Sequence, residues 1–99
     1  MQESDLYGPV KAFLETQGYA VKGEVGAVDV LACRGDEPPV VVELKTGFSL
    51  TLLHQAVARQ AVTDLVYVAV PHRTGKVAAR ALASNVGLCR RLGLGVLTV

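Results

Sequence analysis

Apolar residues recur along this chain at two spacings, and each spacing predicts a different secondary structure. Three stretches repeat apolar residues every three or four positions, as amphipathic helices do: residues 4–17, 49–62 and 76–93. Ser4 or Asp5 is placed to cap the first helix, and Ser49 or Thr51 is placed to cap the second. In the third stretch, the helix is possible either without interruption or with a break near Ser84–Gly87.

Shorter stretches rich in β-branched residues predict strands: residues 19–24, a second run that ends near Cys33, and residues 39–46, 65–70 and 95–99. Turn residues join the first three strands as hairpins, whereas helices separate the later ones. This predicts an antiparallel start followed by parallel strands. We therefore expect an α/β fold, a three-layer α/β/α sandwich with a mixed central sheet, in the order α-β-β-β-α-β-α-β.

Composition limits the class of protein. The 99 residues are 51% apolar, with a mean hydropathy of +0.36, which suits the core of one domain spanning residues 1–99. No uncharged apolar run of about 18 residues is present, and the acidic start Met1–Asp5 lacks a signal-peptide pattern. Cys33 and Cys89 lack disulfide-framework spacing and are interpreted as reduced, buried thiols. These features predict a cytoplasmic domain with no membrane partner.

Charge is unevenly distributed along a chain whose net charge is only +1. Eight of the nine acidic residues lie in residues 1–45, and six of the ten basic residues lie in residues 46–99. This division suits a metal site beside a phosphate-binding flank, with Arg73 and Lys76 as candidate nucleic-acid contacts. Solvated helix faces explain the basic residues almost as well.

The strand at residues 39–46 carries two charges, Glu43 and Lys45, within a valine-rich run typical of a sheet interior. Because side chains at i and i+2 of a strand share a face, the two groups are expected side by side. A same-face ion pair on a half-exposed strand is the purely structural interpretation. Asp29 lies in a second apolar run, and the hairpin between the two runs brings its carboxylate toward Glu43.

Paired carboxylates with open positions for water and phosphate suit Mg²⁺ or Mn²⁺. Such an ion polarises a phosphoryl oxygen and helps to generate hydroxide from bound water. Lys45 is placed to hold the attacking water or to stabilise charge that develops on the phosphate. Asp29, Glu43 and Lys45 are therefore the candidate catalytic residues for phosphodiester hydrolysis.

Asp29, a hairpin and Glu43-Leu44-Lys45 together resemble the Asp…(Asp/Glu)-x-Lys signature of the restriction-endonuclease-like, or PD-(D/E)xK, nucleases. That family has an αβββαβ core, whose element order matches residues 4–70. The resemblance implies that Asp29 and Glu43 bind metal together with the main-chain carbonyl of Leu44, and that Lys45 supports catalysis. Residues 3–71 also resemble an uncharacterised bacterial branch of this superfamily. In that branch a C-terminal region usually follows, which raises the expectation that this chain is a piece of a longer one.

Members of the family often add an acid from the first helix and a glutamine from the helix after the lysine strand. Glu3 matches the acid, and Glu24 competes with it because Glu24 lies at a strand end close to Asp29. Gln55 matches the glutamine and is a candidate catalytic residue. Arg59 follows Gln55 by one helical turn, so it is expected to face the same cleft and to contact phosphate.

These residues predict a Mg²⁺- or Mn²⁺-dependent DNA endonuclease. The alternative is a nuclease-fold module that binds nucleic acid or assembles proteins, for example as a homodimer, without cleaving anything. The intact set of Asp29, Glu43 and Lys45 favours the enzyme. The small size and the near-neutral charge favour the module.

Overall fold

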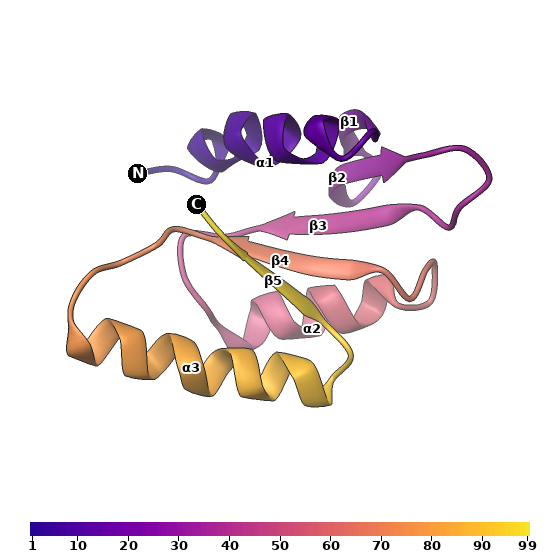
Figure 1. The fold of residues 1–99 in the computed structure, drawn as a ribbon. Coiled ribbons are helices and arrows are strands. Elements are labelled where there is room, and N and C mark those ends of the chain that lie inside the picture. The colour runs from indigo at the N-terminus through magenta and orange to yellow at the C-terminus, as the bar shows by residue number, and fades with distance from the viewer.

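A computed structural model describes residues 1–99, and its helices and strands follow one another in the predicted order (Figure 1). The elements are α1 (Ser4–Thr16), β1 (Ala20–Val25), β2 (Val28–Cys33), β3 (Val40–Leu44), α2 (Leu50–Arg59), β4 (Val66–Val70), α3 (Lys76–Arg91) and β5 (Gly95–Thr98).

The strands form one five-stranded mixed sheet in the order β1-β2-β3-β4-β5. The pairs β1–β2 and β2–β3 are antiparallel, whereas β3–β4 and β4–β5 are parallel. The short turns after β1 and β2 permit the antiparallel pairs, and the helical crossovers after β3 and β4 permit the parallel ones. The prediction of an α/β fold with a mixed sheet is therefore confirmed.

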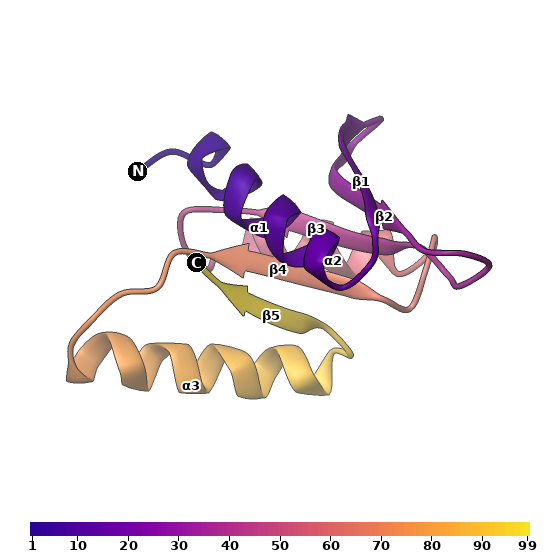
Figure 2. The same cartoon turned by 45° about the horizontal axis from the view of Figure 1, so that its top comes forward.

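Helices lie on both faces of this sheet, and β3 contributes to the core on each side. Val40, Val42 and Leu44 pack on the face that α1 covers, together with the α1 residues Leu6, Val10 and Leu14. Val41 packs on the opposite face, with Leu52 and Ala56 of α2 and Cys89 of α3. Figure 2 shows α1 on one side of the sheet and α3 on the other. Since β3 is covered on both faces, every one of its residues is buried.

Two of the predicted helix boundaries are wrong, and one is confirmed. Glu3 occupies the N-cap of α1 without a side-chain hydrogen bond, so neither Ser4 nor Asp5 caps this helix. Ser49 does cap α2, because its hydroxyl accepts a hydrogen bond from the Leu52 amide at 3.1 Å. This helix ends at Arg59 rather than at Val62.

α3 runs without interruption through Ser84–Gly87, so the break considered for this helix is absent. Its helical spacing is therefore continuous from Lys76 to Arg91. Cys89, near its end, is buried as expected, but Cys33 at the end of β2 is exposed. None of the helices has the length and apolar character needed to cross a membrane.

Candidate functional site

The candidate site lies where β2 and β3 separate. Their ladder pairs Val30 with Val42 and ends there, although one further step would place Asp29 opposite Glu43. Side chains replace the missing main-chain partners at this position. The Leu44 amide donates to Asp29 Oδ2 at 2.8 Å, and the Asp29 amide donates to Glu43 Oε2 at 3.2 Å. The two acids are therefore fixed to each other's strands, as the predicted hairpin requires.

Glu43 is only 2% exposed, and both of its carboxylate oxygens have protein donors. Oε2 accepts from the Asp29 amide, and Oε1 accepts from Arg59 Nε at 2.8 Å. Burial raises the pKa of the Glu43 carboxyl above its ordinary value of 4.5, while the Asp29 amide and the Arg59 guanidinium oppose that rise. The nearby Asp29 carboxylate adds to the rise.

Arg59 connects three parts of the chain at this site. It stands in the last turn of α2, and its Nε contacts Glu43 on β3. Its Nη2 donates to the main-chain carbonyl of Ala27, in the turn between β1 and β2, at 2.8 Å. The partner of Arg59 is thus an internal carboxylate, and Arg59 does not line the cavity beside Asp29.

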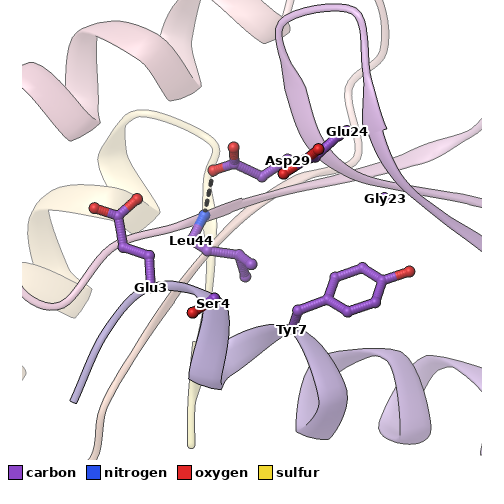
Figure 3. A pocket seen from close by; sticks show the side chains of 7 residues that line it. All are labelled: Glu3, Ser4, Tyr7, Gly23, Glu24, Asp29 and Leu44. Carbon is purple, nitrogen blue, oxygen red and sulfur yellow. Dashed lines mark hydrogen bonds between the residues drawn. The ribbon is translucent and has the colours of Figure 1, made fainter.

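An open cavity of about 470 Å³ lies beside Asp29 (Figure 3). Figure 3 shows Glu3 and Ser4, at the start of α1, on one side, and Glu24 and Asp29, from the β1–β2 hairpin, on the other. The residues that line the cavity are Glu3, Ser4, Tyr7, Gly23, Glu24, Asp29 and Leu44. The two acids that were alternatives at the sequence level therefore share one cavity with Asp29, whereas Glu43 does not line it.

Lys45 does not pair with Glu43. Lys45 directly follows the last residue of β3, and its amide still donates to the Ala69 carbonyl of β4 at 3.1 Å. Instead, Lys45 Nζ lies 3.5 Å from Glu3 Oε1, whereas Glu43 bonds to Arg59 of α2. Glu43 and Lys45 therefore do not form an ion pair with each other, and Lys45 joins the end of β3 to the start of α1.

Carboxylate and carbonyl oxygens are the ligands that Mg²⁺ prefers, so the donors around this cavity are of a suitable type. Asp29 uses Oδ2 for the Leu44 amide, and no protein donor contacts its Oδ1. No three His, Cys, Asp or Glu side chains are close enough together to hold a metal ion jointly. The donor chemistry fits a divalent cation, and coordination by three acids requires side-chain movement.

The other predicted residues do not line the cavity. Gln55 is half-buried on α2, its side chain makes no hydrogen bond, and it does not line the cavity. Arg73 Nη2 donates to the main-chain carbonyl of Thr46 at 2.8 Å, so it holds the segment that follows β3. Lys76 is exposed at the start of α3. The structure brings together Glu3, Glu24, Asp29 and Lys45, and it leaves Gln55 and Lys76 outside the cavity.

Two features of the cavity wall were missed by reasoning from the sequence. The ring of Tyr7 packs directly on Gly23, where a Cβ atom would stand 2.8 Å from Tyr7 Cε1. A glycine inside a predicted strand is the signal that could have indicated this close approach. The next residue, Glu24, has φ +53°, a backbone conformation that non-glycine residues rarely adopt.

No protein-family model, curated protein or solved structure matches this chain. Its functional assignment therefore depends on the chemistry of the residues themselves.

Proposed function

We propose that this domain is a metal-dependent nuclease of the restriction-endonuclease-like type that hydrolyses phosphodiester bonds in DNA. The observation that carries the proposal is the pair of acids at the separation of β2 and β3. Asp29 and Glu43 are held there by reciprocal hydrogen bonds, beside an open acidic cavity with a lysine at its edge. The element order, the mixed sheet and the helices on both of its faces support a three-layer α/β/α core of that type.

In this proposal, Asp29, Glu43 and the main-chain carbonyl of Leu44 hold Mg²⁺ or Mn²⁺, with Glu24 or Glu3 as the third acid. The bound cation supplies a Lewis acid for the phosphoryl oxygen and lowers the pKa of a water molecule. The Leu44 amide fixes the Asp29 carboxylate, so little reorganisation of this side chain is needed. Glu24 has no ion-pair partner in the structure, whereas Glu3 pairs with Lys45.

Lys45 supplies the positive charge of the proposed site. Its Nζ lies at the start of α1, beside the cavity-lining Glu3. From there a lysine ammonium can orient the attacking water by hydrogen bonding and stabilise the negative charge that grows on the phosphate oxygens. Both roles require that Lys45 exchange its contact with Glu3 for the substrate.

One observation favours a module without catalysis. Arg59 and the Asp29 amide occupy both oxygens of Glu43, as in an ion pair whose role is to satisfy a buried charge. In that alternative the domain binds nucleic acid or a second protein, and divalent cations have no effect on it.

Cleavage assays with matched variants test the proposal. The purified chain with Mg²⁺ or Mn²⁺ is expected to cut single-stranded, duplex or branched DNA. Asp29→Asn keeps an acceptor for the Leu44 amide but removes the charge, and Lys45→Ala removes the ammonium. Each is expected to reduce cleavage by about 10²-fold or more while circular dichroism shows an intact fold. Asp36→Asn, in the turn after β2, is the control and is expected to retain full activity.

If the wild-type chain leaves all three DNA forms intact with either cation, the nuclease proposal is wrong. Cation-independent binding of the same DNA, measured by fluorescence anisotropy, would then support the non-catalytic module.

A further inference from the structure

The contact between Arg59 and Glu43 connects the most buried charge in the domain to a side chain that is partly exposed. Glu43 is 2% exposed, whereas the Arg59 side chain is 20% exposed. Besides Glu43, Arg59 bonds only to the carbonyl of Ala27, in an exposed turn. Release of Arg59 therefore breaks these hydrogen bonds without disturbing the packed core on either face of the sheet.

The same contact makes Arg59 a competitor for the proposed cation. Without a metal ion, Glu43 needs the guanidinium, because a buried carboxylate with no positive partner is strongly unfavourable. With a divalent cation at Glu43, the guanidinium becomes a like charge held a few ångströms away, which is repulsive. One carboxylate thus has two alternative positive partners.

We propose that Arg59 is an exchangeable counter-ion: it holds Glu43 in the cation-free domain, and it turns to a substrate phosphate when a divalent cation takes its place. This inference rests on the proposed nuclease function and assigns Arg59 a positioning role within it. A guanidinium suits both partners, since its planar donors match carboxylate and phosphate oxygens equally well. Because Arg59 lies in the last turn of α2, its side chain can leave Glu43 and the β1–β2 turn while the helix stays packed on the sheet.

Calorimetric titration with Mn²⁺ alone, in the absence of DNA, tests the exchange. Arg59→Gln removes the competing charge and is expected to raise the affinity for Mn²⁺ by about tenfold or more. The matched control is Arg73→Gln, because Arg73 also bonds to a main-chain carbonyl but contacts no acid. The affinity of Arg73→Gln for Mn²⁺ is expected to equal that of the wild type. A merely structural Arg59 would give the opposite sign, since its loss would distort the site and weaken Mn²⁺ binding.

Nuclear magnetic resonance of the wild-type chain gives a second measurement that does not depend on a variant folding. The Nε–H of Arg59 is expected to be protected from solvent exchange without cation and to lose that protection on titration with Mg²⁺. The Arg73 side chain serves as the internal reference and should show no change.

The outcomes separate this inference from the proposed function. Suppose that the wild type binds Mn²⁺ and cleaves DNA. If Arg59→Gln then binds Mn²⁺ no more tightly than the wild type, or if Arg59 Nε–H stays protected with Mg²⁺, the proposed exchange of Arg59 is wrong and the nuclease proposal stands. If the wild type neither binds Mn²⁺ nor cleaves DNA, both are wrong.

Discussion

At the scale of single residues, Glu43 presents the main electrostatic problem of the domain. Its carboxylate lies between two packed faces, where an ionised group is stable only with charged or hydrogen-bonded partners. Arg59 and the Asp29 amide are those partners. Burial nonetheless dominates and raises the pKa of Glu43, so this residue links the stability of the fold to pH.

The sign of this link follows from the direction of the shift. Between the ordinary pKa of 4.5 and the raised value, the folded state binds more protons at Glu43 than the unfolded state does. The contribution of Glu43 to the free energy of unfolding is therefore greatest below this pH range, and it falls as pH rises through the range. Urea unfolding of the wild type and Glu43→Gln from about pH 4 to about pH 8 is expected to show the wild type losing stability relative to the variant, and then levelling off. Parallel curves over this range would contradict the prediction.

Glu24 presents a conformational problem rather than an electrostatic one. Its φ of +53° places a non-glycine residue in the left-handed region, at an exposed position that lines the acidic cavity. Glu24→Gly is expected to raise the free energy of unfolding by about 1 kcal/mol, because glycine adopts this backbone without strain. Glu24→Ala is the control, since it also removes the carboxylate but keeps the strain. Equal stabilities of the two variants, measured by urea unfolding, would show that the backbone of Glu24 is not strained.

Sequence reasoning placed Asp29 beside Glu43 correctly, because a short hairpin leaves adjacent strands little choice. It did not foresee that Arg59 would bond to Glu43, although it placed this arginine in the cleft. That contact depends on how α2 crosses the sheet, and local spacing does not encode the crossing. It also placed Lys45 with Glu43, because it could not foresee that Glu3 of the N-terminal segment would pair with Lys45 and that Arg59 of α2 would pair with Glu43.

At the scale of elements, the β4–β5 pair depends on one close approach. Tyr67 and Gly95 are register partners, and a Cβ atom on Gly95 would stand 2.2 Å from Tyr67 Cδ2. Gly95→Ala is therefore expected to lower the free energy of unfolding by about 1–3 kcal/mol, since either the ring or the strand must shift.

Gly87→Ala is the control for this substitution. Gly87 lies inside α3, where an added Cβ meets no atom within 4 Å. Alanine favours the helix there, so a gain of about 0.5–1 kcal/mol is expected. Thermal or urea unfolding should thus shift in opposite directions for the two glycines. A shift in the same direction would show that the tyrosine contact does not govern the β4–β5 pair.

The elements themselves were predictable, and their ends were less so. The order of helices and strands follows from apolar spacing, which core burial imposes directly. The end of α2 depends instead on a tertiary contact. The Thr63 hydroxyl donates to the Pro39 carbonyl at 2.7 Å and accepts from the Leu65 amide, which holds the chain in a turn before β4. Apolar spacing carries no information about such a bond.

At the scale of the whole molecule, the charge division along the sequence does not persist as a division in space. Arg59, from the base-rich part of the chain, neutralises Glu43 from the acid-rich part. Arg73 bonds to main chain close to Lys45. Basic side chains are therefore brought to the end of the sheet where the acidic cavity opens, an arrangement that the linear sequence suggested only in outline. Of the basic residues near this end, the proposed site uses Lys45 and Arg59, whereas Arg73 only holds the main chain.

The strand order β1-β2-β3-β4-β5 is also the order in which a ribosome delivers the strands. Each new strand joins an existing edge, so none has to insert between two strands that formed earlier. We expect this sequential growth to favour folding during synthesis, N-terminal part first. One consequence concerns Glu43: the nascent β1–β3 sheet contains this acid before α2 has delivered Arg59. Full burial of Glu43 must then wait for α2 and for β4, whose Val68 is the register partner of Glu43, so the site is completed only after both have joined the sheet.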